Sequence, residues 1–420
     1  MQIFKFGGAS VKDAAAFRNV RFIVQNYSVP GELLIVVSAI GKTTNALETI
    51  FSKAHGNLIY EEDLLKLKDY HFSVASELFS QNENRVFQHL ELLFANLQEQ
   101  LQNLVPDKFD QQYDQIISFG ELLASTLLHH YLKTENLPAV WLDCRKYIQT
   151  DSTWREGKVD WTWTEKLIQR DLPEMLSNGN IIVTQGFIGG TSNGQTTTLG
   201  REGSDYSAAI FAYCLRAEKM TIWKDVAGLL NADPKIFPNT VRYPQISYQE
   251  TIEMAYYGAS VIHPKTIKPL ADRQIPLFVK SFLDPESEGT RIGICPHEKL
   301  APAFILKQNQ CLISFGVKDF SFISEQNLST IFHVLSELRI KINLMQNSAI
   351  SFSICTDYDP TRLEKLIETL RDQFQIQYNI SLQLFTIKNY DSESIRNLTA
   401  GKEILLEQRT RNTYQFACRA

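Results

Sequence analysis

The feature that most constrains this fold is a series of short apolar runs that alternate with helical stretches and end in glycine-containing loops. In the clearest run, Leu33–Val37, every residue is apolar. An uninterrupted run of this kind is typical of a parallel strand buried on both faces. Asn180–Ile188 and Lys219–Lys224 are similar, and helix-forming stretches lie between these runs. The sequence therefore predicts an α/β fold with a mainly parallel central sheet, and ligands should bind at the carboxyl ends of its strands.

The same alternation continues to residue 282. Further strands are expected at Gln2–Phe6, Pro138–Asp143 and Ile275–Phe282, the last being the final strand of the sheet. Helices are expected at Asp13–Val24, across much of 46–105, from Glu121 onward, at Ile246–Tyr257 and after Gly258. Leu283–Pro302 is rich in proline and glycine, which predicts a domain boundary. Beyond it the expected strands are Cys311–Val317, Ile340–Leu344, Ala349–Thr356, Leu382–Ile387 and Glu403–Ala417, with helices at Glu325–Leu338 and Pro360–Phe374.

Composition excludes several classes of protein. With 420 residues, 44% hydrophobic and 21% charged, the chain can form two or three ordinary globular domains. The net charge of -5 and the scattered lysines argue against a nucleic-acid partner. We find no export signal and no apolar run long enough to span a membrane. The six cysteines form no CxxC pair, so we expect a reduced cytoplasmic protein without structural zinc.

Lys5 stands on the first strand, directly before Gly7 and Gly8. Glycines expose backbone N–H groups and a lysine supplies a point charge, so this arrangement suits a phosphate group. A plain strand–turn–helix start with an exposed lysine fits the same residues equally well.

The stretch 196–215 passes from threonines through Gly200–Gly203 to Ser204 and Asp205, and then into an apolar run with helical spacing. Ser204 or Asp205 should cap this helix, and the glycines allow close approach of a ligand. A helix N-terminus beside Arg201 and Asp205 suits anions and a metal ion. A glycine turn capped by Ser204, without a ligand, remains the alternative.

The chain contains two further motifs that could bind a ligand. Gly41-Lys42-Thr43 copies the end of a P-loop, but the position of its first glycine holds Val36, so we reject a P-loop. Glu121 falls in the first turn of an apolar helix, where it either complements the helix dipole or faces a ligand amine.

Six blocks taken together resemble the aspartokinases of the amino acid kinase superfamily. They are KFGGAS at 5–10, VVSAIGKTTN at 36–45, SFGELLAS at 118–125, TLGREGSDYSAA at 198–209, KDVAGLLNADP at 224–234 and YYGASVIHP at 256–264. The resemblance covers about 300 residues in order, and the C-terminal part resembles an ACT regulatory region. It implies a three-layer kinase domain at 1–297, an ACT-like domain at 298–386 and a partial second ACT-like module at 387–420.

The resemblance implies transfer of the γ-phosphoryl group of ATP, with Mg²⁺, to the side-chain carboxylate of L-aspartate. The product would be 4-phospho-L-aspartate, on the route to lysine, threonine and methionine. The implied catalytic residues are Lys5, Asp205 and Ser38. The implied aspartate ligands are Thr44, Glu121, Arg201 and Ser204. The implied nucleotide ligands are Gly7, Gly8, Lys224, Asp225, Asp233 and Lys265, and no metal ligand from the protein is certain.

Three residues depart from the family pattern. Ala9 replaces a threonine, Glu202 adds negative charge near the phosphate site, and Ser260 stands where many relatives have lysine. These departures bear on nucleotide affinity more than on the reaction. Two other interpretations stay open: a different amino acid kinase, such as a glutamate or acetylglutamate kinase, and an inactive amino-acid sensor on a kinase scaffold.

The stretch 339–357 resembles the part of an ACT region that binds an effector between paired modules, although ACT folds also serve only to dimerise. Lysine-sensitive relatives commonly have acidic residues at the positions of Asn343 and Ala349. A cationic effector in a partly buried site needs carboxylate partners. We therefore expect an ACT-built homodimer with weak or absent lysine inhibition. The candidate ligands for a neutral effector such as threonine are Asn343, Gln346, Asn347 and Ser348.

Overall fold

The computed structural model describes residues 1–80, 83–259, 262–295, 300–319 and 321–419. The chain forms two compact units. The first comprises Met1–Leu229, Pro244–Ile252 and Val261–Pro296, and the second comprises Leu230–Tyr243, Glu253–Ser260 and His297–Ala420. Within the described ranges, none of the helices is both long and apolar enough to cross a membrane.

The first unit is built on an eight-stranded sheet with the strand order β3-β5-β2-β1-β8-β10-β11-β9. Its strands are β1 (Gln2–Phe6), β2 (Leu33–Val37), β3 (Ala139–Leu142), β5 (Ile181–Gln185), β8 (Lys219–Lys224), β9 (Gln245–Ser247), β10 (Leu277–Ser281) and β11 (Thr290–Gly293). The six strands from β3 to β10 in this order are mutually parallel, and β11 is antiparallel to β10. The predicted α/β fold with a mainly parallel sheet is confirmed.

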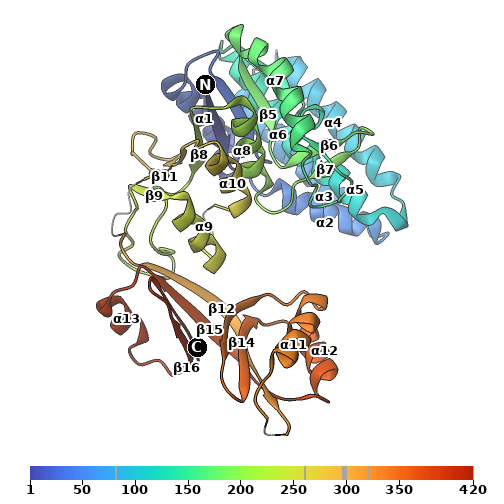
Figure 1. Cartoon of the computed structure of the whole chain (residues 1–420). Helices are drawn as coiled ribbons and strands as arrows, with labels where there is room; N and C mark the ends of the chain where they lie inside the picture. Colours follow the sequence, from blue (N-terminus) through green and yellow to red (C-terminus); the bar gives the residue numbers. More distant parts are fainter. Residues whose placement is uncertain (81–82, 260–261, 296–299, 320, 420) are drawn as a thin grey trace. The chain divides into compact units, whose positions relative to one another are not determined.

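Two helical layers cover this sheet (Figure 1). The connections from β1 to β2 and from β2 to β3 cross the sheet in one direction, whereas those from β3 to β5 and from β5 to β8 cross it in the other. Because crossovers of this kind are right-handed, the two sets of connecting helices lie on opposite faces. Helices α1 (Ala14–Tyr27) and α6 (Phe119–Thr134) therefore cover one face. Helices α7 (Trp161–Ser177), α8 (Gly203–Leu215) and α10 (Pro264–Asp272) cover the other.

The long segment between β2 and α6 is helical, as the sequence predicts. It forms α2 (Thr43–His55), α3 (Glu61–Leu78), α4 (Asn84–Gln102) and α5 (Phe109–Ile117). Short 3₁₀ turns occur at Gly8–Val11, Pro106–Lys108 and Cys144–Lys146.

The structure corrects three of the elements predicted from the sequence. The stretch Asn180–Ile188, expected as one strand, belongs to two. Strand β5 ends before Gly186 and Phe187, and β6 (Ile188–Thr191) then begins in a separate sheet. That small sheet has the order β4-β6-β7, with β4 (Gln149–Thr150) and β7 (Thr196–Thr198). The expected helix Ile246–Tyr257 begins as strand β9 and becomes helix α9 (Tyr248–Tyr257). Strand β11, inside the proline-rich boundary, follows β10, so β10 is not the last strand of the sheet.

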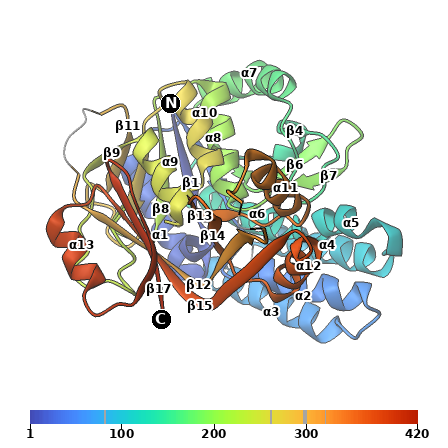
Figure 2. The same cartoon turned by 60° about the horizontal axis from the view of Figure 1, so that its bottom comes forward.

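The second unit contains one antiparallel sheet with the order β13-β14-β12-β15-β17-β16. Its strands are β12 (Ala303–Val317), β13 (Ile342–Asn347), β14 (Ser351–Asp357), β15 (Phe374–Lys388), β16 (Ile404–Arg409) and β17 (Thr413–Arg419). Helices α11 (Glu325–Glu337) and α12 (Pro360–Leu370) pack near the β14 end, and α13 (Ser392–Thr399) packs on β15 and β17 (Figure 2). An antiparallel sheet with helices agrees with the expected ACT-like α+β region.

Two segments inside the kinase-like sequence belong to this second unit. Asn231 donates a hydrogen bond to the carbonyl oxygen of Pro302 (2.9 Å), and the rings of Phe237 and Phe304 lie 5.7 Å apart. These contacts explain why Leu230–Tyr243 groups with β12 rather than with the flanking residues. They join residues far apart in sequence, which local patterns cannot reveal.

Candidate active site

A pocket of about 540 Å³ lies at the carboxyl ends of β1 and β2, beside the first turn of α8. The chain leaves β1 for β2 on one side, and β8 pairs with β1 on the other, so this is a switch point of the sheet. The predicted residues that line the pocket are Lys5, Gly8, Ser38, Thr44, Glu121, Arg201, Ser204, Asp205 and Lys224. Residues separated by up to 219 positions in sequence thus meet in one cavity.

Lys5 and Asp205 form a buried ion pair in this pocket. The Nζ atom of Lys5 lies 2.6 Å from Oδ1 of Asp205, and the Nζ atom of Lys224 lies 3.6 Å from Oδ2. Burial raises the pKa of the Asp205 carboxyl, but the charges of Lys5 and Lys224 outweigh that effect and hold it below its ordinary value. Asp205 therefore stays ionised and fixes two ammonium groups at the end of the sheet.

The loop after β1 approaches the loop after β2 through glycine. The N–H of Gly41 donates to the carbonyl oxygen of Gly8 (3.0 Å), and a Cβ atom on Gly8 would lie 2.8 Å from the carbonyl oxygen of Ala39. No side chain fits there, so glycine is required at position 8. A Cβ atom on Gly7 would lie 3.6 Å from Nζ of Lys5, an ordinary van der Waals contact, so Gly7 lies directly beside the lysine.

Glu121 is a buried carboxyl group with one oxygen left for a ligand. Its Oε1 atom accepts a hydrogen bond from the N–H of Ala39 (3.1 Å), and Oε2 has no hydrogen-bond partner within the described part of the chain. Burial raises the pKa of Glu121 to about 8, although the Ala39 N–H and the charge of Lys5 act in the opposite direction. A buried carboxylate that lacks a partner is costly, so a cationic group on a ligand would stabilise its ionised form.

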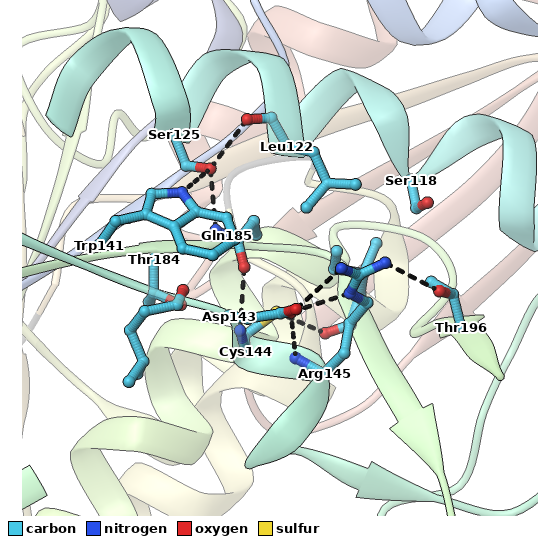
Figure 3. A network of polar contacts seen from close by, with 12 residues as sticks. Ser118, Leu122, Ser125, Trp141, Asp143, Cys144, Arg145, Thr184, Gln185 and Thr196 are labelled. Atoms are coloured by element: carbon cyan, nitrogen blue, oxygen red, sulfur yellow. Dashed lines mark hydrogen bonds and ion pairs between the residues drawn. The ribbon is translucent and has the colours of Figure 1, made fainter. Parts of the chain in front are cut away.

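A hydrogen-bond network fixes the helix that carries Glu121 (Figure 3). Ser125 of α6 accepts hydrogen bonds from Nε1 of Trp141 (3.0 Å) and Nε2 of Gln185 (2.8 Å), and it donates to the carbonyl oxygen of Leu122. Oε1 of Gln185 accepts from the N–H of Cys144 (2.9 Å). The network connects α6 to Gln185 of β5, to Trp141 of β3 and to Cys144 just after β3. It therefore fixes the position of α6 and of Glu121, which α6 carries.

The start of α8 differs from the sequence expectation, because neither Ser204 nor Asp205 is the N-cap. Glu202 is the N-cap, with a left-handed φ of 53°, and the helix begins at Gly203. Ser204 lies in the first turn, and a Cβ atom on Gly186 would come within 2.5 Å of its Cβ. The helix therefore begins before the residues expected to cap it, Ser204 and Asp205. The left-handed turn at Glu202 and the close packing of Ser204 against Gly186 accompany this earlier start.

The comparisons with known proteins agree with this geometry. The model of the amino acid kinase family matches residues 1–281. Lysine-sensitive aspartokinase 3 of Escherichia coli (strain K12) is 31% identical over 359 residues, which cover 84% of this chain and 78% of that protein. The chain belongs to the amino acid kinase family, among the aspartokinases.

Two crystal structures of E. coli aspartokinase III are similar to the whole chain. The complex with aspartate and ADP, in the R-state, has a TM-score of 0.82 at 27% identity and covers 100% of this chain and 96% of its own. The complex with lysine and aspartate, in the T-state, has a TM-score of 0.80 at 27% identity, with coverage of 99% and 95%.

Several residues expected to bind nucleotide in this aspartokinase lie outside the pocket lining. Asp225 is exposed just after β8, and Lys265 forms an ion pair with Glu156. Asp233 belongs to the second unit, where its Oδ1 accepts from the N–H of Lys235 (2.9 Å). Ser260, one of the three departures from the family pattern, lies outside the described residues.

The other two departures are visible. Glu202 lines the pocket, and its Oε2 atom has no hydrogen-bond partner among the residues that the structure describes. Ala9 is exposed in the 3₁₀ turn after Gly7.

The candidate effector residues of the second unit have different surroundings. Asn343 is buried: its Oδ1 accepts from Nζ of Lys307 (2.7 Å), and its Nδ2 donates to Gln310 and Asp357. Gln346, Asn347 and Ser348 are exposed, and Ser348 bonds within the turn that precedes β14. The Asn343 amide is thus engaged inside the protein, whereas the other three side chains face solvent.

Five further polar or aromatic residues line the pocket that were not predicted from the sequence: Glu48, Tyr113, Arg155, Phe187 and Thr198. One signal was available, because Glu48 lies four residues after Thr44 and so shares its helix face. Tyr113 and Arg155 reach the pocket only through long-range contacts, and no local pattern marks them.

Proposed function

We propose that this chain catalyses transfer of the γ-phosphoryl group of ATP to the β-carboxylate of L-aspartate, giving 4-phospho-L-aspartate and ADP. One observation carries the proposal. A single pocket holds an ionised lysine–aspartate pair near a buried glutamate that has one oxygen without a partner. The lysine of the ion pair suits a phosphoryl group, and the glutamate suits the ammonium group of an amino acid. Similarity to an aspartokinase that binds aspartate and ADP supports the same reaction.

On the acceptor side, Glu121 binds the α-ammonium and Arg201 pairs with the α-carboxylate, as a planar guanidinium can. Thr44 and Ser204 complete the contacts, and Ser38 helps to position the β-carboxylate. One oxygen of that carboxylate attacks the γ-phosphorus while the bond to the β,γ-bridging oxygen breaks. No proton has to move, because the acceptor is already ionised.

On the donor side, Lys5 and Lys224 stabilise the charge on the transferring group, and Asp205 keeps both lysines in place. The glycines at 7 and 8 let the phosphates come close to the backbone, and Asp225 and Lys265 are proposed to contact the nucleotide. No group of three His, Cys, Asp or Glu side chains forms a metal site within the described ranges. Mg²⁺ would be supplied with the nucleotide as MgATP and would neutralise charge on its phosphates.

We also propose the organisation inferred from the resemblance: a kinase domain at 1–297, an ACT-like domain at 298–386 and a partial second module at 387–420. Pairing of ACT-like modules between two copies would give a homodimer, and β13 lies at a sheet edge with Met345 exposed. Cys144, Cys214, Cys311, Cys355 and Cys418 are free thiols, which supports a reducing cytoplasmic location.

The proposal is tested by measuring ADP release with MgATP and a panel of acceptors: aspartate, glutamate, N-acetylglutamate and none. Release that depends on aspartate supports the proposal. Release that depends on glutamate or N-acetylglutamate instead would identify another amino acid kinase. Binding of amino acid without any ADP release would identify an inactive sensor.

A further inference from the structure

Arg155 is a pocket residue without an assigned role. It lies in the loop between β4 and α7 and lines the same cavity as Glu121 and Arg201. Its φ of 65° falls in the left-handed region, which is unfavourable for a residue with a side chain. Such a conformation persists where neighbouring groups hold it, and it is frequent at ligand sites.

The buried carboxylate of Asp114, on α5, holds the backbone of Arg155. Oδ2 of Asp114 accepts hydrogen bonds from the N–H of Arg155 (2.9 Å) and of Thr198 (3.0 Å), and Oδ1 accepts from the Thr198 hydroxyl (2.7 Å). The N–H of Gly157 also donates to the carbonyl oxygen of Thr198 (2.8 Å). Because Thr198 ends the strand that leads to Arg201, one carboxylate anchors the backbone segments of both arginines.

The guanidinium of Arg155 has two contacts within the described residues, a cation–π contact and a long ion pair. Its Cζ atom lies 4.1 Å from the ring centroid of Tyr113, whose hydroxyl donates to Oε1 of Glu48 (2.5 Å). The ion pair of Arg155 with Asp110 is 3.5 Å long and about half exposed on both sides, so it contributes little. This cation–π contact with a hydrogen-bonded tyrosine ring holds the guanidinium in place and leaves N–H donors for a ligand.

The backbone segments that carry the two arginines lie close together. A Cβ atom on Gly200, the neighbour of Arg201, would lie 3.4 Å from the carbonyl oxygen of Arg155. An α-amino acid carries its ammonium and its α-carboxylate on one carbon, so an ammonium at Glu121 brings the carboxylate to the same part of the pocket. A carboxylate has enough lone pairs to accept from two guanidinium groups.

We propose that Arg155 is a second substrate-binding arginine, which contacts the α-carboxylate of the acceptor together with Arg201. Asp114 is the positioning residue for both. The proposal rests on the proposed function and adds a requirement for a free α-carboxylate in the substrate.

The test uses the full chain and four variants. Arg155→Gly removes the guanidinium and suits the left-handed backbone, and Arg155→Lys keeps the charge but loses the planar fork. Arg201→Gln is the positive control. Arg216→Gly is the matched negative control, because Arg216 is an exposed arginine with a φ of 49° at the opposite end of α8 from Glu202.

Arg155→Gly should raise the KM for aspartate about tenfold or more, as expected for loss of a charge-assisted hydrogen bond, and leave the KM for ATP unchanged. Its preference for aspartate over aspartate α-amide should fall. Arg155→Lys should have a KM for aspartate between those of wild type and Arg155→Gly, but it should regain less of the preference for aspartate over the α-amide. Arg216→Gly should behave as wild type. An unchanged KM for aspartate in Arg155→Gly, or an unchanged preference against the α-amide, would overturn the proposal.

Asp114→Asn tests the positioning role, since the amide is similar in shape but loses one acceptor oxygen. A selective rise in the KM for aspartate, with the KM for ATP unchanged, supports the role. A lower melting temperature with neither KM changed would mean that Asp114 is only structural. If wild type itself releases no ADP with aspartate, the proposed function fails; if wild type is active and Arg155→Gly is unaffected, only this inference fails.

Discussion

Nζ of Lys5 and Oδ1 of Asp205 lie 2.6 Å apart, and both side chains are more than nine-tenths buried. The pair joins the carboxyl end of β1 to the first turn of α8, across 200 residues of sequence. Lys224 shares the same carboxylate, so two cations stand at one point of the pocket. This arrangement places positive charge where a phosphoryl group would be transferred, and it predicts how the variants of each residue should behave.

Lys5→Met should reduce kcat by several orders of magnitude and change both KM values much less. The lysine is proposed to act on charge that develops in the transition state, so its loss affects turnover rather than binding. Steady-state kinetics in both substrates measure this. A change confined to KM would make Lys5 a binding residue only.

A control separates chemistry from folding. Lys5→Met leaves Asp205 with Lys224 as its remaining cationic partner, and breaking a buried pair costs about 3–5 kcal/mol of unfolding free energy. Lys5→Met combined with Asp205→Asn should recover much of the melting temperature without recovering activity. Recovery of activity in the double variant would contradict the assigned role.

Glu121 should make aspartate binding depend on pH. Its pKa is raised to about 8 by burial, and a substrate ammonium beside it would favour the ionised form. Aspartate binding near pH 7 should therefore release a proton, and affinity should improve as pH rises from 6 towards 8. Calorimetry in buffers of different ionisation enthalpy measures the proton. Glu121→Gln should bind weakly and release none; proton release that persists in this variant would place the titrating group elsewhere.

The same shift predicts a stability effect without substrate. The pKa of Glu121 is higher in the folded chain than its ordinary value of 4.5. Its contribution to stability is therefore fully present below about pH 4.5 and is lost as pH rises through about 8. Relative to wild type, Glu121→Gln should gain thermal stability as pH rises from 5 to 9. A constant difference in melting temperature over that range would show that Glu121 does not titrate there.

Part of this site follows from sequence alone. Lys5, Gly7 and Gly8 come directly after a strand, and parallel strands bring such residues to one edge, so the location could be predicted. Glu121 could be named as a candidate, but its burial and its free oxygen depend on the Ser125 network, which joins distant segments. Those properties needed the structure.

Arg155 and the start of α8 show where local patterns fail. Arg155 reaches the pocket because Asp114, 41 residues earlier, holds a left-handed backbone. Helix α8 was expected to be capped by Ser204 or Asp205, yet tight packing on Gly186 and the turn at Glu202 decide its first residue. Both outcomes depend on tertiary contacts that no short motif encodes.

Gly186→Ala should damage the site without removing any polar group. A Cβ atom there would lie 2.5 Å from Cβ and 2.8 Å from Cα of Ser204, so the first turn of α8 must move. We expect a large loss of kcat together with a lower melting temperature. Gly194→Ala is the control, because its added Cβ meets nothing within 4 Å, although its φ of 76° costs about 1 kcal/mol. Equal activity in the two variants would show that the position of Ser204 does not matter.

Regulation by lysine should be weak or absent. The Asn343 amide is engaged by Lys307, Gln310 and Asp357, and it supplies no carboxylate for a cationic effector. If an effector binds, the exposed Gln346–Ser348 segment favours a neutral amino acid such as threonine. Lysine and threonine are titrated separately into the kinase assay with aspartate near its KM. Strong inhibition by low concentrations of lysine would contradict this expectation. Such inhibition would instead resemble the lysine sensitivity for which the E. coli relative is named.

The central claim is that this pocket phosphorylates a carboxylate of aspartate. The most direct measurement incubates the full chain with MgATP and aspartate in the presence of hydroxylamine, which traps acyl phosphates as hydroxamates. The account predicts aspartate-dependent ADP formation with an equal amount of aspartyl β-hydroxamate, and neither product above background with Lys5→Met. Folded protein that binds both ATP and aspartate but forms no hydroxamate would contradict it.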